Sequence, residues 1–561
     1  MVKITNLLCT LFALLVVVSM NSCTDTESAS DPTAGVATSI PSNASGVLLL
    51  NTKQLLSKAD YKTLKETEFF KDWIKTAQKE APEMVPFLED PEASGISLQS
   101  NIGLYFAMEK EKAKAGLPPE AAFLFPVADA AKVAEAVQKA LKDSPDAKTE
   151  EKDGYSITAL DKDLFLVQSP KIFAATTFND EAKIKNIIAP SGDDISTNSN
   201  FAANPHNGKD IMFWMHADPL VESMLAADPM MNLSVKAGMG MAQIPDEALK
   251  DNYLSVYYDF KDGGEIEAGS VFEFSDALKQ ELGPLFPDEL AADYAKYIPS
   301  ENLAVAASLG VNSAGVLNFL AKRGFDQQVD NNLKAVGLDL GQISNGITGD
   351  LAIGVYPPAT EGADPDIVLA LGLKDKAFME GIMEKFGPML NAQKSGDRYT
   401  MTGGSNMMDP SAKPMQFFAN IQGDIVVISN SEAKLDQALA GNNNELVGEL
   451  QKGWLGMYTD YDAMGNHYDL LANYIPIDPA TMAMSKMMSE YQDIASVKII
   501  GKGDQLHGHT QLKTTDINSL KRLIQIADKI FKDREKIQAE IEKHQSDEFE
   551  DFDAMFDEEN T

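Results

Sequence analysis

The sequence predicts an α+β fold with two tandem homologous units and a C-terminal helix. The first observation is a repeat. The pattern of residues 95–105, Gly-Ile-x5-Ile-Gly-Leu-Tyr, returns 251 residues later at 346–356 as Gly-Ile-x5-Ile-Gly-Val-Tyr. The second is a series of short apolar runs separated by turn residues, which is typical of antiparallel strands. The third is the helical spacing of apolar residues between some of these runs. We therefore expect each unit to be a mostly antiparallel sheet with helices packed on one face.

Further echoes keep the same order along the chain, and their offsets drift only slightly. They pair residues 40–42 with 298–300, 124–129 with 370–375, 181–184 with 432–435, 215–218 with 457–460, and 255–256 with 496–497. Changes of loop length in a duplicated domain would produce such a drift. The alternative is two unrelated halves that share short strand fragments.

The N-terminus predicts export and a lipid anchor. Lys3 precedes an apolar run at residues 7–20, and Ser22-Cys23 follows it. The run is too short to span a bilayer comfortably. We expect residues 1–22 to be a lipoprotein signal peptide, Cys23 to be lipidated, and residues 23–39 to be a flexible tether. The alternative is an ordinary secretory signal with a chance cysteine.

Charge and cysteine content narrow the function classes. The chain has 48 basic and 84 acidic residues, a net charge of −36. Such a surface repels phosphate backbones, so nucleic acid is excluded as a partner. It also disfavours docking on anionic lipid, so membrane attachment needs the covalent anchor. Of the two cysteines, Cys9 and Cys23, only Cys23 would remain after cleavage, so we expect no disulfide.

The first unit is expected at residues 40–290. Asp129 and Asp180 are good N-caps for two of its helices, and residues 261–264, Lys-Asp-Gly-Gly, have the chemistry of a hairpin turn. The expected helices are 55–79, 130–142 and 181–188, and the expected strands are 46–51, 102–108, 121–127, 155–160, 164–168, 173–177, 211–216, 254–260 and 265–274.

The second unit is expected at residues 291–514, with final strands at 496–501 and 505–512. A C-terminal helix is expected at 515–545, capped by Thr515 or Asp516. The last segment, 546–561, holds eight acidic residues. It is expected to be a disordered tail that aids solubility. The alternative is a linear motif whose phenylalanines dock in a partner's groove: Phe549, Phe552 and Phe556.

Several of these motifs resemble one known family. They are the Ser22-Cys23 signal, the Ile-Pro-Ser-Asn-Ala opening at 40–44, the Leu-Leu-Ser-Lys helix start at 55–58 and the Gly-Ile strand. Together they resemble a family of Bacteroidetes envelope lipoproteins known only as a domain of unknown function (4836). The resemblance implies a location in the Bacteroidetes envelope. We expect the lipid anchor to hold the protein at the outer membrane, on either the periplasmic or the cell-surface face. It implies no activity and no functional residue.

Candidate chemistry has a structural interpretation in each case. Ser431 and Lys434 match a Ser-x-x-Lys nucleophile pattern, but the repeat equates Ser431 with Asp180, a helix cap. His507 and His509 would share one strand face and could bind a metal, yet the first unit does not repeat them. Asp460 begins a sequence that resembles a calcium-binding loop, but the later ligand and glycine positions do not match that loop. We therefore assign no catalytic residue, metal site or cofactor.

Methionine is the remaining anomaly, at 25 residues, with one cluster before the final strand pair of each unit. Methionines fill irregular cores, line adaptable apolar grooves or bind Cu(I), and these alternatives stay open. The groove hypothesis nominates the following ligand-binding residues: Met230, Met231, Met484, Met487 and Met488.

These observations favour a non-enzymatic, lipid-anchored envelope protein that acts as a binding or scaffold module, with an envelope protein as its possible partner. One alternative is a carrier of an apolar ligand or lipid that uses the methionine-rich segments. A second is an uncharacterised hydrolase, for which the sequence nominates no residue.

Overall fold

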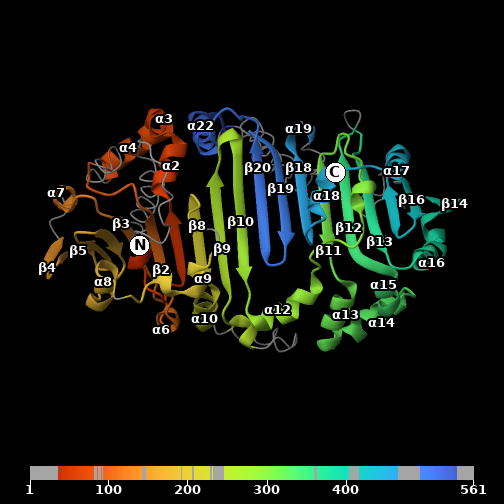
Figure 1. Cartoon of the computed structure of the whole chain (residues 1–561), viewed down its shortest axis with the longest axis horizontal. Coiled ribbons are helices and arrows are strands. Elements are labelled where there is room, and N and C mark those ends of the chain that lie inside the picture. The colour runs from red at the N-terminus through yellow and green to blue at the C-terminus, as the bar shows by residue number, and fades with distance from the viewer. Residues whose placement is uncertain are drawn as a thin grey trace, which may run out of the picture. The chain divides into compact units, whose positions relative to one another are not determined.

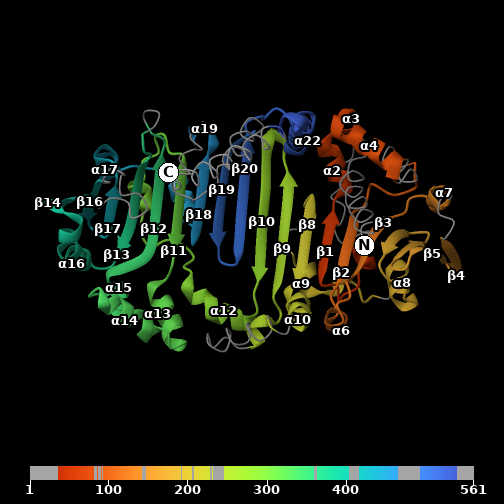
Figure 2. The ribbon, with the colours of Figure 1, turned by 180° about the vertical axis from the view of Figure 1, so that it is seen from behind.

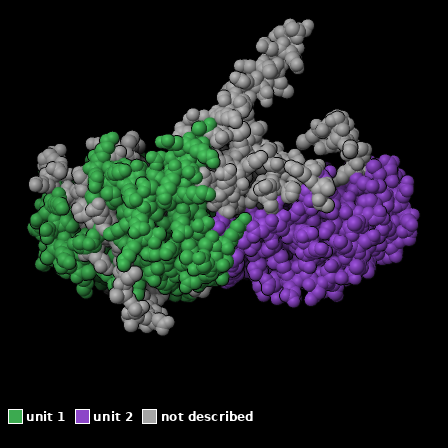
Figure 3. Space-filling model, turned by 90° about the horizontal axis from the view of Figure 1, so that it is seen from above, with its two compact units in different colours: residues 1–237, 249–273, 512–540 green, residues 238–248, 274–511, 541–561 purple. Residues whose placement is uncertain are grey.

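The protein is described from a computed structural model that covers two compact units (Figure 3). Unit 1 comprises residues 1–237, 249–273 and 512–540, and unit 2 comprises 238–248, 274–511 and 541–561. The residues that the structure describes are 36–80, 85, 90, 93–141, 147–190, 192–204, 207–227, 230, 246–358, 363–402, 416–464, 493–537 and 539. Among them, no helix has the length and apolarity needed to cross a membrane.

The described residues of unit 1 form ten antiparallel strands, several of which are labelled in Figure 1. They are β1 (Gly46–Leu50), β2 (Ile102–Ala107), β3 (Glu120–Pro126), β4 (Lys148–Lys152), β5 (Tyr155–Asp161), β6 (Leu164–Gln168), β7 (Ile172–Thr176), β8 (Ile211–His216), β9 (Tyr253–Phe260) and β10 (Glu265–Glu273). Their order across the sheet is β4-β5-β6-β7-β3-β2-β1-β8-β9-β10. The α+β class and the antiparallel sheet predicted from the sequence are confirmed.

Helices cover both faces of the unit 1 sheet, and not one face as the sequence predicted. One core contains Leu50, Ile102 and Phe125 under the longer helices, and the other contains Leu49, Tyr105 and Leu124 under the shorter ones. The first layer is α2 (Thr52–Ala59), α3 (Tyr61–Glu66), α4 (Glu68–Glu80) and α7 (Ala130–Leu141), and the second is η1 (Val36–Ser39), α8 (Glu181–Ile188), η3 (Ile195–Thr197) and α9 (Ser199–Ala202). Two more helices lie next to β2 and β8 in sequence: α6 (Lys110–Lys114) and α10 (Ala217–Ala227).

The C-terminal helix α22 (Ser519–Lys532) belongs to unit 1. Leu520 and Ile524 are buried in the same core as the residues of α2 and α4. The Asp528 carboxylate accepts hydrogen bonds from the backbone N–H groups of Glu68 (2.5 Å) and Phe69 (3.3 Å) at the start of α4. The helix begins at Ser519, and its N-cap is Asn518, whereas the sequence predicted Thr515 or Asp516 as the cap.

The described residues of unit 2 also form ten antiparallel strands, several of which are labelled in Figure 2. They are β11 (Val305–Gly310), β12 (Ile347–Tyr356), β13 (Asp366–Leu373), β14 (Gln393–Ser395), β15 (Arg398–Thr402), β16 (Gln416–Gln422), β17 (Ile425–Ser429), β18 (Leu455–Asp460), β19 (Ile494–Lys502) and β20 (Gln505–Leu512). Their order is β14-β15-β16-β17-β13-β12-β11-β18-β19-β20. Counted from the first strand of each unit, this is the order found in unit 1.

The helices of unit 2 cover its sheet unevenly. One face is buried under η7 (Tyr294–Lys296), α17 (Glu432–Leu439) and α18 (Glu445–Leu450), and α16 (Lys376–Phe386) packs on the other face near β13 and β17. The helices that follow β11 lie past the ends of β11 and β12 in both views, and buried residues are few in them: α13 (Ser313–Lys322), α14 (Asp326–Ala335) and α15 (Leu340–Gly346). The other short helices described in unit 2 are α12 (Asp276–Leu282), η6 (Gly283–Leu285), η8 (Gly387–Leu390) and α19 (Tyr461–Met464), whereas η5 (Asp262–Gly264) lies in unit 1 and η4 (Asp246–Leu249) lies at the boundary between the segments of the two units.

Within the described residues, the chain passes between the units after residues 248, 273 and 511. Helix α12 follows β10 of unit 1 but lies in unit 2, where the Glu281 carboxylate pairs with the buried Arg323 guanidinium at the end of α13 (2.6 Å). Helix α22 follows β20 of unit 2 but lies in unit 1. Unit 1 is therefore completed by α22, which the chain reaches only after it has passed through residues 274–511 of unit 2.

Candidate functional site

Most residues that the sequence nominated lie outside the described part of the chain. These are Cys23, Met231, Met484, Met487, Met488, Phe549, Phe552 and Phe556. Met230 is described, and 70% of its surface is exposed. The predictions for the lipid anchor, the tail and the methionine segments therefore stay predictions.

The Ser431–Lys434 pair is structural, as the sequence interpretation favoured. The Ser431 hydroxyl accepts the backbone N–H of Lys434 as the N-cap of α17, just as Asp180 accepts that of Lys183 for α8. The Lys434 ammonium lies over the ring of Tyr356, 4.1 Å from its centroid. A lysine held there does not serve Ser431 as a base.

The other two chemical candidates also have structural partners. The Asp460 carboxylate accepts the backbone N–H of Ala463 (2.8 Å), which makes it a helix cap at α19. His507 lies exposed on β20 and its Nε2 is 3.0 Å from the side-chain oxygen of Gln505. Neither arrangement provides a calcium loop or a two-histidine metal site by itself.

A buried ion network in unit 1 is a feature that sequence reasoning missed. The Lys58 ammonium of α2 lies 2.7 Å from the Asp210 carboxylate and 2.9 Å from that of Asp259. Lys209 and Lys261 also contact Asp259, at 3.1 and 2.6 Å. Burial raises the pKa of Asp210. Burial would raise the pKa of Asp259 as well, but hydrogen bonds from Lys261 and Lys58 outweigh it and hold that pKa well below its usual range.

This ion network links α2 to strands of the sheet, and the groups named here are not available as a general base. Each acidic group named here is paired with a lysine, and Asp210 also accepts the backbone N–H of Phe260 (2.7 Å). Burial and the nearby Glu267 carboxylate raise the pKa of Tyr257 to about 12, so its hydroxyl stays protonated. A general base near neutral pH needs a group whose pKa lies close to 7. We therefore read the network as a clamp that holds α2 to the sheet.

The strongest candidate site is an apolar face of the unit 2 sheet, which we call the open face. It consists of side chains that lie in register across five strands: Val305, Ala307, Leu309, Leu351, Ile353, Val355, Ile367, Leu369, Leu455, Met457, Val497 and Ile499. None of them is fully buried, and none belongs to a hydrophobic core of the described residues. Leu309 is 37% exposed and Met457 is 45% exposed.

The equivalent positions of unit 1 are covered. Gly103 lies opposite Leu49 in the β1–β2 ladder, and Gly354 lies opposite Ala306 in the β11–β12 ladder. The next ladder positions, Leu50 and Ile102, therefore correspond to Ala307 and Ile353. Leu50 and Ile102 are buried at 5% and 0% exposure beneath α2, α4 and α22, whereas their unit 2 counterparts are partly exposed.

A contiguous apolar surface of this kind is typical of an interaction site. The described residues form an α+β fold with a large antiparallel sheet, and unit 2 carries the open face. The chain belongs to the family described as domain of unknown function DUF4836, whose model matches residues 37–437. The resemblance to this family is thereby confirmed, while the Bacteroidetes origin and the lipoprotein character stay predictions. No curated protein and no solved structure matches the chain.

Proposed function

We propose that this protein is a non-enzymatic binding or scaffold module of the cell envelope. The observation that carries the proposal is the open face, because no hydrophobic core of the described residues includes these aligned apolar side chains, and surfaces of this kind are typical of interaction sites. The occupant that we propose is an amphipathic helix of a partner protein. Unit 1 supports this choice, since amphipathic helices cover the same strand positions there.

We propose further that Cys23 carries a lipid and that this anchor holds the protein at the outer membrane. The supporting pattern is Lys3, the apolar run 7–20 and Ser22-Cys23. Replacing Cys23 by Ala is expected to move the protein from the membrane fraction to the soluble fraction. Retention of that variant at the membrane would contradict the anchor and would leave the open-face proposal untouched.

We also infer that the two units arose by duplication. The shared strand order supports this, and so does a contact that occurs in both units. A Cβ atom on Gly103 would lie 3.6 Å from Ile40, and one on Gly354 would lie 2.9 Å from Ile298. These are the glycines and isoleucines of the two sequence echoes, so motifs that are far apart in sequence pack together in each unit.

Site-specific cross-linking tests the partner. A photo-cross-linking amino acid is placed at Met457, and the full-length protein is irradiated in cells. We expect an adduct of discrete protein mass whose cross-linked peptide has apolar residues at helical spacing. Leu309→Lys, which changes a side chain on the same face, should abolish that adduct without lowering the unfolding temperature of the protein, because Leu309 is already exposed.

Met389 provides the matched control. It is also an exposed methionine of unit 2, at 77%, but it lies on η8 and not on the sheet. The same photo-cross-linker at 389 should give no such adduct. A lipid-sized adduct at 457 would favour the alternative of an apolar-ligand carrier, and a cross-link to this chain's own residues would contradict the partner. Equal adducts at 457 and 389 would also overturn the proposal.

A further inference from the structure

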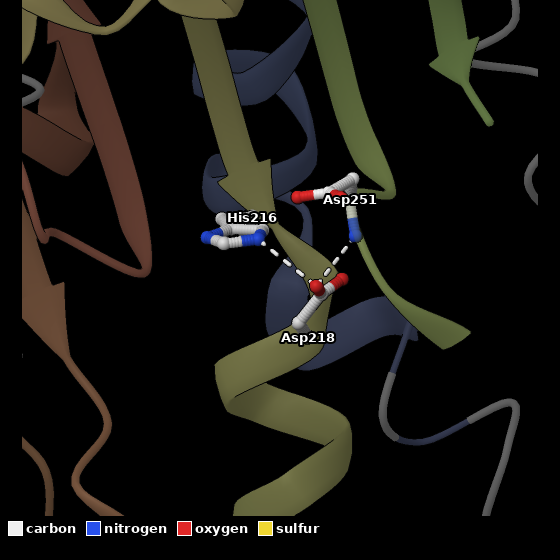
Figure 4. A group of neighbouring side chains, drawn as sticks. All are labelled: His216, Asp218 and Asp251. Carbon is white, nitrogen blue, oxygen red and sulfur yellow. Dashed lines mark hydrogen bonds and ion pairs between the residues drawn. The ribbon is translucent and has the colours of Figure 1, made fainter. Parts of the chain in front are cut away.

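We propose that His216, Asp218 and Asp251 bind a divalent transition-metal ion. The three side chains come from the end of β8, the first turn of α10 and the residue group before β9, and Figure 4 shows that they lie around one point. One ligand atom from each lies within 4.8 Å of the others. Among the described residues, it is the one group of three or more possible metal-ligating side chains that lie this close together. The proposal is independent of the open face.

The spacing of the first two ligand atoms already suits a metal. Nε2 of His216 lies 3.3 Å from Oδ2 of Asp218. Two ligands bonded to one tetrahedral Zn²⁺ at about 2.0–2.1 Å lie roughly 3.4 Å apart. Nε2 is also buried and makes no hydrogen bond within the described structure, so the contact with Asp218 is close but lacks hydrogen-bond geometry. A cation would satisfy Nε2 and would use a second lone pair of Oδ2, which also accepts the backbone N–H of Asp251.

The surroundings hold the histidine and the first carboxylate in place. The His216 ring stacks on the ring of Tyr253 at a centroid distance of 4.5 Å, and Tyr253 in turn stacks on Trp214 at 5.5 Å. The Asp218 carboxylate accepts the backbone N–H groups of Asp251 (2.6 Å) and Asn252 (3.2 Å). Groups that orient a ligand in this way raise metal affinity, because less freedom is lost on binding.

Asp251 supplies the adjustable ligand. Its backbone is left-handed, with φ of 57°, and its side chain is exposed. The backbone bond to Asp218 fixes where the residue lies, while the exposed carboxylate is able to move inward by about 1 Å to reach the spacing that Zn²⁺ requires. One imidazole and two carboxylates form a ligand set that Zn²⁺, Mn²⁺ and Fe²⁺ accept, and water would complete the coordination.

The second unit offers a natural comparison. Tyr458 and Asp460 repeat the two-residue spacing of His216 and Asp218, and the Tyr458 hydroxyl lies 3.3 Å from the Asp460 carboxylate. A phenol that hydrogen-bonds a carboxylate replaces the imidazole there, so the pair is satisfied without an ion. The metal-binding chemistry is therefore expected in unit 1.

Calorimetric titration with Zn²⁺ alone tests the site. The chain from residue 23 is used, with Cys23→Ser to exclude a thiol ligand. We expect one Zn²⁺ to bind at this site and His216→Gln and Asp251→Asn each to weaken binding at least tenfold. X-ray absorption should show only nitrogen and oxygen ligands. Asp218 is left unchanged, because its carboxylate also holds the backbone of the loop.

His507→Gln is the control, since that histidine is also accessible to zinc. It should leave the His216 site unchanged. Equal unfolding temperatures of the metal-free variants show that weaker binding is not unfolding. Zinc binding that persists unchanged in His216→Gln, or that is lost in His507→Gln instead, would overturn the proposal. A protein with all three ligands intact that binds no Zn²⁺ would overturn it as well.

Discussion

Gly103 and Gly354 show how single residues set the spacing between layers. Each lies on the second strand of its unit, and each faces an isoleucine that precedes the first strand. A Cβ atom at Gly354 would lie 2.9 Å from a methyl group of Ile298 and 2.9 Å from the Tyr356 hydroxyl. That hydroxyl donates to the Pro299 carbonyl at 2.9 Å. The glycine therefore allows the Ile-Pro-Ser segment to lie directly on the strand.

Gly354→Ala is expected to lower the free energy of unfolding by about 1–3 kcal/mol, because the added methyl group overpacks this contact. Urea denaturation of the full-length protein measures the change. Gly381 on α16 is the control, since a Cβ atom there would meet nothing within 4 Å. Gly381→Ala should be neutral or stabilise the helix by up to about 1 kcal/mol. Equal effects of the two substitutions would refute the packing argument.

Residue chemistry was predictable from sequence where it acts locally. The helix caps at Asp129, Asp180 and Ser431 are confirmed, because an N-cap depends on neighbouring backbone N–H groups. The network around Asp259 was missed, because its lysines come from positions 58, 209 and 261, which only the fold brings together. The His216 cluster was missed for the same reason, as Asp251 is distant in sequence from β8.

At the scale of elements, the sequence predicted most strands and misread some helices. The expected helix 55–79 is three helices, because Asp60 takes a left-handed backbone conformation between α2 and α3 and Thr67 is extended between α3 and α4. Strand β4 was missed because its sequence, Lys-Thr-Glu-Glu-Lys, is fully exposed and has no apolar face. The hairpin at 261–264 is confirmed by β9 and β10, with Gly263 at φ of 79°.

Helix α22 gives an element-scale prediction. A chain that ends at Lys513 loses the burial of Leu520 and Ile524 and the cap that Asp528 provides to α4. Each buried side chain contributes about 1.5–3 kcal/mol and the cap about 1 kcal/mol. The sum of roughly 4–7 kcal/mol is comparable with the whole stability of a typical domain. We expect unit 1 to lose cooperative unfolding in this truncation.

Hydrogen exchange of the backbone amides in α2 and α4 measures that loss, and the amides of β13 and β17 in unit 2 should stay protected. A second chain that ends at residue 545 retains the helix and removes only the acidic segment. It should unfold like the full-length protein. Protection of α2 and α4 that survives the truncation at 513 would show that unit 1 does not need α22.

At the scale of the whole molecule, charge is expected to affect stability. The excess of 84 acidic over 48 basic residues places like charges close together in the folded state. Exposed ion pairs stabilise a folded protein only slightly in water. Salt that screens them therefore removes less stability than it adds by screening the repulsion between like charges. Raising NaCl from 0.01 to 0.15 M shortens the Debye length from about 30 to 8 Å. We expect the unfolding temperature to rise by about 2–4 °C, or about 1 kcal/mol.

Calorimetric scans at several NaCl concentrations measure this shift, and an equimolar series with sucrose separates it from general solute effects. A fall in the unfolding temperature across the same range would show that attractive ion pairs outweigh the repulsion.

Whole-molecule features were the hardest to predict from the sequence. The sequence of β12 from Leu351 to Tyr356 would be the same kind of apolar strand whether helices cover its second face or leave that face open. Only the placement of α13, α14 and α15 reveals the open face.

The return of the chain to unit 1 at α22 has a consequence for biosynthesis. The last strand of unit 1 ends at Glu273, yet α22 begins at Ser519, 519 − 273 = 246 residues later. At a synthesis rate of roughly 5–20 residues per second, this interval lasts about 12–50 s. During this interval, the apolar sides of α2 and α4 lack α22, which packs against them in the folded protein. The half of the protein that is made first is thus finished last, and it is the half that would need a chaperone's protection while the ribosome completes the chain.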